Sequence, residues 1–325
     1  MERRQAVRAI VLAALLMSQG VSRAQLRPNV IVIGLLDAGD RPEWWNAFRK
    51  GMRELGYVEG RDVRFEARLA KGDLDTLTTM AKGLVRSNVD VIVTGGAVAA
   101  VAAQRASTTI PIIMASGTDQ VSLGLAATLA HPGGNVTGVS SLNSELMNKR
   151  FELLREVVPK LSRLGVLWHG DNTPSMASVR DIEGAAANAR IGLQSFGVRT
   201  ADQLGTTFAA MSAAHLDALV VVNSPFIFAE RKRIADLALA HRLAGMYGAA
   251  EYVDAGGLLS YAPSYAEMFR HAAIYVDKIL KGARPADMPI EQPTTFELVI
   301  NAATARSLGL VIPAAMMARA NRVVQ

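Results

Sequence analysis

The stretch Val30-Ile31-Val32-Ile33-Gly34-Leu35-Leu36 is a nearly unbroken apolar run, as expected for a strand buried on both faces of a parallel sheet. Beyond it, apolar residues recur at helical spacing and stop before Gly56, a residue suited to end a helix: Trp44, Phe48, Met52 and Leu55. A buried strand followed by an amphipathic helix is the repeating unit of α/β proteins, so this stretch sets the fold class.

The same unit recurs along the chain in two series. Predicted strands begin near residues 30, 63, 89, 110 and 136, and again near 164, 193, 218, 244 and 258. Helical patterns separate the strands, including one near 121–129, and a long helix at 145–158 divides the series. Strands and helices that alternate at this spacing favour right-handed crossovers and parallel sheets. We therefore predict an α/β fold of two doubly wound parallel-sheet lobes.

The C-terminal part continues after the second series is complete. Ser264-Tyr265-Ala266-Glu267 fits a capping box that opens a helix to Leu280, and a proline-containing loop then precedes a strand at 296–300. These elements must pack on lobes already built, so the chain crosses between the lobes more than once. We expect lobe 1 at 28–141, completed by about 262–292, and lobe 2 at 142–260, completed by about 293–325.

The N-terminus has the pattern of an export signal. Arg3, Arg4 and Arg8 precede the apolar run Ala9–Met17, and Ser22-Arg23-Ala24 offers small residues around a cleavage site. We predict a signal peptide over 1–24, cleavage near Ala24 and a periplasmic protein with no later membrane span. An uncleaved anchor or an amphipathic N-terminal helix is the alternative.

Composition excludes several kinds of chemistry. The 325 residues include no cysteine, which removes disulfides, thiolate metal sites and cysteine nucleophiles. The five histidines are scattered, and neither a nucleophile elbow nor a phosphate-binding glycine loop occurs. We expect no cofactor, no metal and no catalytic residue. Because four arginines and Glu2 in the first 24 residues account for three of the six net positive charges, no nucleic-acid partner is predicted.

A binding site is expected where the predicted strands end, since ligands of doubly wound sheets bind outside the carboxyl ends. Polar or aromatic residues follow nearly every strand there, which suits a cleft that holds a small solute from both lobes. The candidate ligand-binding residues are Asp37, Trp44, Thr94, Gly95, Gly96, Ser116, Thr118, Asp119, Ser140, His169, Asn172, Asn223, Phe226, Tyr247, Glu251 and Tyr261.

Each candidate has a purely structural alternative. Thr94-Gly95-Gly96 leads into a helix whose free amides suit a carboxylate or phosphate, or it is a plain turn. Ser116–Asp119 is either a donor cluster or a helix cap, and the tyrosines at 247 and 261 are either ligand contacts or core. Glu251 either balances a cationic group or lies in a solvated turn. Trp44 and Trp45 are adjacent on a helix, so we expect only one of them in the core.

Several stretches together resemble one known family. They are Ala47–Gly60, Val89–Thr94, Ile110–Ile113, His131–Gly138, Ala255–Tyr261, Tyr275–Gly282 and Phe296–Asn301. They are similar to the substrate-binding proteins of ABC transporters that include receptors for tryptophan and other aromatic amino acids. The resemblance extends from about Val30 to Val324. The sequence departs from the family pattern at two places. Members often have Asp-Pro where this chain has Asp119-Gln120, and a Thr-Pro-type turn where it has Thr94-Gly95-Gly96-Ala97.

The resemblance implies a type I periplasmic binding fold, with three segments crossing between the lobes and a ligand in the cleft. We therefore expect a monomeric, non-enzymatic receptor that closes on a small polar or amphipathic, amino-acid-like solute and delivers it to an ABC transporter permease. Two alternatives remain open from the residues. One is a periplasmic ligand-sensing domain of a signalling receptor, and the other is an enzyme that uses cleft carboxylates such as Asp37 or Glu251.

Overall fold

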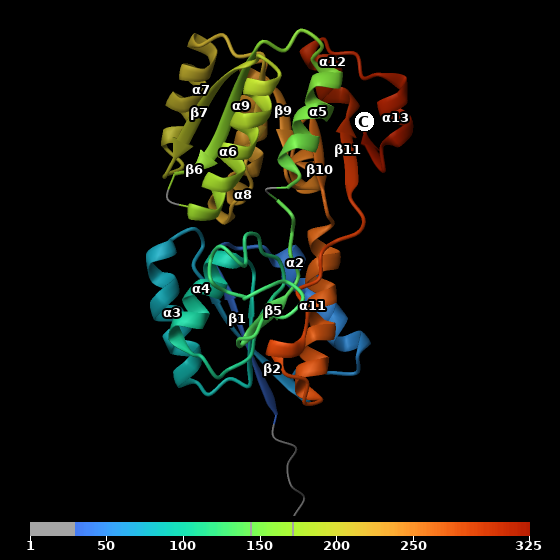
Figure 1. Ribbon diagram of the computed structural model, residues 1–325. Helices are drawn as coiled ribbons and strands as arrows, with labels where there is room; N and C mark the ends of the chain where they lie inside the picture. The colour runs from blue at the N-terminus through green and yellow to red at the C-terminus, as the bar shows by residue number, and fades with distance from the viewer. Residues whose placement is uncertain (1–29, 144, 171) are drawn as a thin grey trace, which may run out of the picture. The chain divides into compact units, whose positions relative to one another are not determined.

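The computed structural model describes residues 30–143, 145–170 and 172–325, so the predicted signal peptide lies outside the described residues. Strands and helices alternate along this part of the chain and form two separate sheets (Figure 1). The first sheet has five strands and the second has seven, and helices cover both faces of each sheet. The predicted α/β class with two doubly wound lobes is thus observed.

The first lobe contains the five strands in the order β2-β1-β3-β4-β5, all parallel. Their side chains alternate between two cores, because successive residues of a strand face opposite sides of the sheet. Ile33 and Leu35 pack with the core under α2 and α11, whereas Leu36 packs with α3 and α4 on the other face. The strands are β1 Ile31–Asp37, β2 Val63–Leu69, β3 Val91–Thr94, β4 Ile112–Met114 and β5 Val136–Gly138. The helices are α2 Pro42–Glu54, η2 Leu74–Thr76, α3 Leu77–Arg86, α4 Ala97–Ala106 and α11 Tyr265–Leu280.

The second lobe contains seven strands in the order β12-β11-β10-β9-β8-β6-β7. All neighbours are parallel except β10 and β11, which are antiparallel. The strands are β6 Arg163–His169, β7 Gly192–Val198, β8 Ala218–Val221, β9 Ala244–Tyr247, β10 Leu259–Ala262, β11 Glu297–Asn301 and β12 Arg322–Val324. The helices are α5 Met147–Val157, α6 Thr173–Asn188, α7 Gln203–Ala213, α8 Pro225–Ala229, α9 Arg231–Ala240, α10 Ala250–Asp254, α12 Ala302–Leu308 and α13 Ala314–Arg319.

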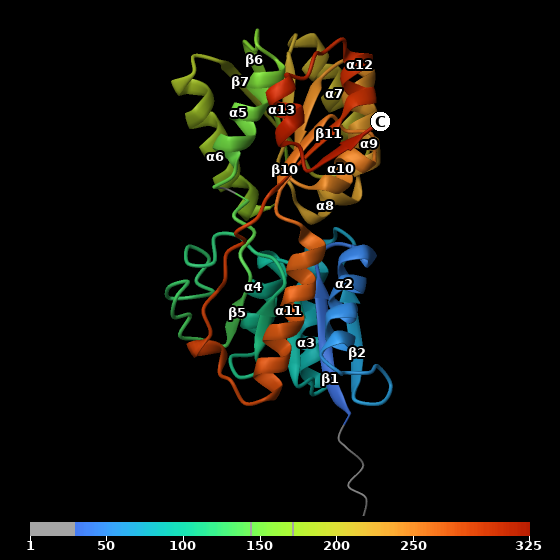
Figure 2. The same cartoon turned by 90° about the vertical axis from the view of Figure 1, so that its right-hand side faces the viewer.

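The chain passes between the lobes three times, as the predicted three-segment hinge requires. It leaves the first sheet after β5, returns after β10 to form α11 beside α2, and leaves again after the short helix η3, Pro285–Asp287, to form β11 (Figure 2). The first and third crossings are hydrogen-bonded to each other, because the amide of Ser140 donates to the carbonyl of Glu291 at 2.8 Å. This pairing keeps two hinge segments side by side.

Residues 121–129 do not form the predicted helix. They form turns, and Gly124 within them has a φ of +71°. A left-handed residue in the middle of the segment interrupts the helical hydrogen-bond ladder, and glycine adopts that conformation at little cost. The apolar residues at 123 and 125 still pack on the core under α4, which explains their periodic pattern.

Candidate functional site

A cavity of about 80 Å³ lies where the carboxyl ends of the two sheets meet the hinge. A buried water needs at least roughly 10–15 Å³ of such space, so the cavity has room for several waters or one small solute. It is lined by Ala38, Arg41, Gly95, Gly96, Ala97, Val98, Ala99, Ser116, Gly117, Thr118, Ser141, Asn143, Asn172, Asn223, Ser224, Pro225 and Tyr265. Both lobes and the hinge therefore contribute to one site.

The wall from lobe 1 is built around the N-terminus of α4. The strand β3 ends at Thr94, and the glycines that follow bring the chain to Ala97, where the helix begins. A Cβ atom on Gly95 would collide with the Asp37 carboxylate and the Arg41 guanidinium, so the close approach requires glycine. The first amides of a helix have no intrahelical acceptor, and the helix dipole favours negative charge beside them. This wall therefore suits an anionic or hydrogen-bond-accepting group.

Arg41 and Asp37 form a buried ion pair behind this wall. Nε of Arg41 donates to Asp37 Oδ2 at 3.1 Å, Nη2 pairs with Asp37 Oδ1, and Nη2 also donates to the carbonyl of Gly95 at 3.0 Å. The Asp37 carboxylate accepts further bonds from the indole of Trp45, at 2.9 Å, and from the amide of Gly39, at 2.9 Å. Arg41 Nη1 has no hydrogen bond within the described part of the chain and remains for the cavity.

A chain of neutral hydrogen-bonding groups runs from lobe 2 to Tyr265 of α11 in lobe 1. The hydroxyl of Tyr252 donates to Asn223 Oδ1 at 3.1 Å, and Asn223 Nδ2 donates to the hydroxyl of Tyr265 at 3.4 Å. Two buried acceptors beside the cavity, Asn172 Oδ1 and Thr118 Oγ1, have no hydrogen-bond partner among the residues that the structure describes. A buried polar atom without a partner costs free energy, so these two atoms point to a polar ligand.

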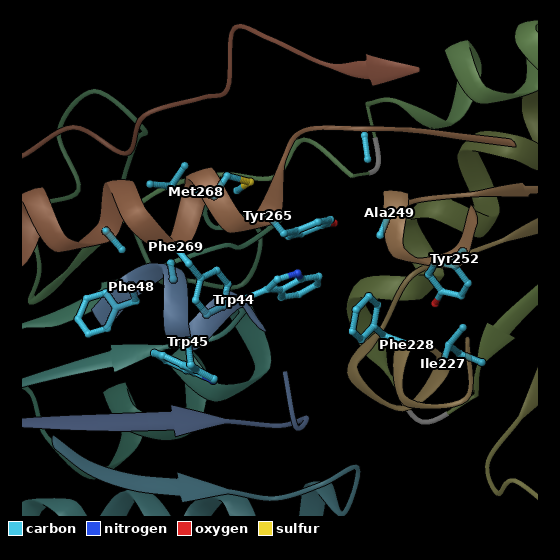
Figure 3. Packing of buried hydrophobic residues seen from close by; sticks show 14 of the residues in the cluster. Trp44, Trp45, Phe48, Ile227, Phe228, Ala249, Tyr252, Tyr265, Met268 and Phe269 are labelled. Carbon is cyan, nitrogen blue, oxygen red and sulfur yellow. The ribbon is translucent and has the colours of Figure 1, made fainter. Parts of the chain in front are cut away.

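Aromatic side chains from the two lobes pack against each other beside Tyr265 (Figure 3). The Trp44 ring, from α2, stacks on Tyr265 at 4.4 Å between ring centres and contacts Phe228, from lobe 2, at 4.6 Å. Trp44 Nε1 donates to Glu251 Oε1 across the lobes at 2.5 Å. Burial raises the pKa of the Glu251 carboxyl, because desolvation disfavours its charged form. These contacts join the two lobes in the observed conformation.

Six of the sixteen predicted residues line the cavity: Gly95, Gly96, Ser116, Thr118, Asn172 and Asn223. Three more lie directly behind it. Asp37 is buried under Arg41, and Thr94 is buried at the end of β3. Ser140 belongs to the first crossing, where its hydroxyl accepts from the amide of Leu142 at 3.4 Å.

The remaining predicted residues are placed outside the lining. Tyr247 is fully buried and stacks on Tyr252 at 4.9 Å in the core of lobe 2, because β9 ends beneath α10. The rings of His169 and Phe226 contact each other at 4.9 Å, and the ring of Tyr261 contacts Phe296 at 5.8 Å. Asp119 lies in a turn with a φ of +54°.

Both adjacent tryptophans are buried, so the expectation that only one belongs to the core is wrong. The reason is that α2 is covered twice, by α11 of its own lobe and by α8 of the other lobe (Figure 3). Trp44 and its partner Glu251 join the lobes and do not line the cavity. Neither side chain is therefore available to cover a ligand in this conformation.

Sequence reasoning missed three important lining residues, Arg41, Asn143 and Tyr265. Arg41 stands four residues after Asp37, and this spacing was a usable signal for a buried pair. Asn143 and Tyr265 lie on crossing segments, several residues beyond the ends of β5 and β10, where the strand-end rule does not place a site. Residues of a hinge therefore need the fold before they can be assigned to the site.

Within 30–143, 145–170 and 172–325, no three histidine, aspartate or glutamate side chains are grouped as a metal site would require. None of the helices described there has the length and apolar character needed to cross a membrane.

Comparison with known proteins identifies relatives over nearly the whole chain. The family model of ABC transporter substrate binding proteins matches residues 29–324. A tyrosine-binding protein of Clostridioides difficile is 25% identical over 263 residues, covering 81% of this chain and 75% of the relative. A Streptococcus structure described as an ABC domain in complex with L-Trp has a TM-score of 0.84 and 27% identity, covering 90% of this chain and 99% of the other. A conserved domain protein from Vibrio cholerae has a TM-score of 0.85 and 25% identity, over 91% and 100%.

The fold is shared more widely. A leucine-binding protein of Thermotoga maritima has a TM-score of 0.54 at 15% identity, a likeness that concerns the fold alone. The predicted type I periplasmic binding fold is confirmed by these structures. The prediction that the chain is not an enzyme is also confirmed, because its relatives are solute-binding proteins.

Proposed function

The chain belongs to the ABC transporter substrate-binding protein family, and we propose that it is an exported receptor that delivers a small solute to the permease of an ABC importer. The solute is polar or amphipathic and amino-acid-like. The observation that carries this proposal is the cavity, which takes residues from lobe 1, the hinge and lobe 2 and leaves buried polar atoms without partners. A ligand there contacts both lobes at once.

Two relatives support the proposed ligand class. One is named a tyrosine-binding protein, and one structure holds L-Trp. The α4 amides and Arg41 Nη1 suit the carboxylate of such a solute, and the unpartnered oxygens of Asn172 and Thr118 suit a donor on it. The six lining residues of the predicted set, together with Arg41, Asn143 and Tyr265, are the proposed contacts.

The mechanism follows from the position of the site. A ligand that contacts both lobes stabilises the closed arrangement, and the population shifts toward it by the difference in affinity between closed and open forms. The permease then recognises the closed form. Export through a signal peptide over 1–24, a monomeric state and lobe boundaries at 28–141 with 262–292 and at 142–260 with 293–325 are parts of the same proposal.

Native mass spectrometry of the exported protein as purified tests the proposal. We expect a co-purifying small solute, and we expect added solute to raise the melting temperature as mass action requires. X-ray scattering checks closure through a smaller radius of gyration on addition of that solute. If nothing co-purifies and neither amino acids nor small acids shift the melting temperature, the proposal fails.

A matched pair of variants ties binding to the cavity. A Cβ atom on Gly96 meets only the Ser116 carbonyl oxygen, at 3.7 Å, and the φ of 173° is extended backbone that any residue adopts. Gly96→Leu should therefore fold and abolish binding by filling the site. Gly205→Leu, on α7 with nothing within 4 Å of its added Cβ and outside the lining, should bind normally.

A further inference from the structure

Arg150 is a fully buried cation without a counterion. Its Nε donates to the carbonyl of Tyr261 at 2.8 Å and its Nη1 to Asn143 Oδ1 at 2.7 Å, whereas Nη2 has no hydrogen-bond partner in the described part of the chain. Among the described residues no carboxylate pairs with it, and the ionisable groups beside it are the phenols of Tyr252, Tyr261 and Tyr265. Burial lowers the pKa of Arg150 to about 10, so the guanidinium remains charged at neutral pH. An isolated buried charge is unfavourable unless something supplies the opposite charge.

Asn143 connects this charge to the cavity. Its Oδ1 accepts from the guanidinium, which fixes the orientation of the side-chain amide, and the residue itself lines the cavity. Nδ2 makes no hydrogen bond within the described part of the chain and is therefore the group left for a ligand. A cation bonded to Oδ1 polarises the amide and strengthens Nδ2–H as a donor.

The cavity offers no negative charge of its own. None of its lining residues in the described ranges is an aspartate or glutamate. Asp37, which lies behind the lining, is paired with Arg41. Arg41 Nη1 and the first amides of α4 add further donors on the opposite wall.

We propose that the cavity selects a carboxylate, which contacts Asn143 Nδ2 and supplies the negative charge that Arg150 lacks. Arg150 is a positioning residue, since it acts through Asn143. This inference rests on the proposed function, because it requires a solute in this cavity, and it narrows the ligand class. An amino group on the solute is able to donate to the neutral oxygens of Asn172 and Thr118, so the selectivity that we propose concerns the carboxylate and not the amino group.

The test measures charge selectivity by calorimetry with 4-methylpentanoate, its neutral primary amide, L-leucine and 3-methylbutan-1-amine. For the wild-type protein we expect the acid to bind at least about tenfold more tightly than its amide, as for a charge-assisted bond against a neutral one. The amine, which has no carboxylate, should bind more weakly than both the acid and L-leucine.

Three variants separate charge from structure. Asn143→Asp is nearly isosteric and places a carboxylate against Arg150, and Arg150→Met removes the charge while keeping most of the volume. Both should bring the acid-to-amide affinity ratio close to one, and Arg150→Lys should restore part of it. A merely structural role would weaken acid and amide alike and leave their ratio unchanged.

Three results overturn the inference: a ratio that is the same in wild type and Arg150→Met, tightest binding of the amine, or a co-purifying solute without an anionic group. Where a different acid co-purifies, the same acid and amide pair is made from it. Failure of every probe together with the absence of any co-purifying solute is a different result, because it removes the proposed function itself.

Discussion

Two buried arginines, one lining the cavity and one bonded to a lining residue, differ in whether a carboxylate neutralises them. Arg41, in lobe 1, is neutralised by Asp37 four residues earlier, and that carboxylate is further held by Trp45 and Gly39. Arg150, in lobe 2, bonds only to neutral acceptors among the described residues, and no carboxylate there compensates its charge. The charge of Arg41 is therefore balanced without a ligand, whereas we propose that a bound carboxylate balances the charge of Arg150.

The difference separates structural from functional use of the same side chain. A paired buried charge loses stability when either partner is removed, because the other is left alone. An unpaired buried charge already bears that cost in the unliganded protein. Removing it therefore relieves a penalty, and the loss appears in binding.

The largest effect on stability is expected when Arg41, like Arg150, is left without a carboxylate partner. Asp37→Asn keeps the shape of the side chain but removes its charge, and we expect a loss of about 3–5 kcal/mol of unfolding free energy. Arg41→Met should cost a similar amount, because it leaves Asp37 unpaired. Urea unfolding measures both. A loss below about 1 kcal/mol in both variants would contradict the assignment of this pair as structural.

The opposite behaviour is expected for Arg150→Met without ligand. The removed desolvation penalty offsets the lost hydrogen bonds to Tyr261 and Asn143, so the unfolding free energy should change by less than about 1 kcal/mol or rise. Urea unfolding of the solute-free protein is again the measurement, and Arg41→Met is the matched control. Equal destabilisation by the two substitutions would remove the contrast between the arginines.

Glu251 extends the comparison to a buried acid. Protonation makes a buried carboxyl group neutral, whereas a buried arginine keeps its charge. Its pKa is raised from 4.5 by burial, so the stability it contributes is fully present below that ordinary value. That stability is lost as the pH rises through the raised pKa of the folded protein. Glu251→Gln still accepts from Trp44 and should flatten this dependence.

Melting temperatures between pH 4 and 7 measure the effect. The control is Glu59→Gln, since Glu59 is exposed and lies 4.0 Å from Arg49. If the melting temperature of Glu251→Gln falls between pH 4 and 7 as much as that of the wild type, the Glu251 carboxyl does not cause the pH dependence.

The smallest effect concerns a neutral group reserved for a ligand. Thr118 Oγ1 is buried without a partner, so Thr118→Val should leave the unliganded protein within about 1 kcal/mol of wild type or slightly more stable. Binding of the co-purifying solute should weaken severalfold. Ser122→Ala, on the same turn region but exposed, is the control. Unchanged affinity in Thr118→Val would remove this oxygen from the site.

Local patterns predicted much of the fold. Apolar runs such as Ile31–Leu36 identify buried strands because both faces of these sheets are covered. The pattern at 121–129 misled because Gly124 adopts a left-handed conformation that apolar spacing does not reveal. The antiparallel β11 also lay beyond local prediction, because its direction depends on the third crossing between the lobes.

The site was less predictable than the fold. The rule that ligands bind at carboxyl ends found Gly95, Gly96 and Asn172, because it follows from sheet topology alone. Tyr247 ends a strand as well, yet its ring packs into the core, since which way a side chain turns depends on the helix above it. Asn143 and Arg150 depend on a hinge geometry that joins distant segments.

A nuclear magnetic resonance titration of 4-methylpentanoate labelled with ¹³C at its carboxyl group, bound to the protein, tests the central claim most directly. A carboxylate that faces an uncompensated guanidinium is favoured in its charged form. The bound carboxyl should therefore titrate well below its pKa in water, and Arg150→Met should reverse that shift. A bound carboxyl that titrates at or above its value in water would contradict the claim that the ligand neutralises Arg150.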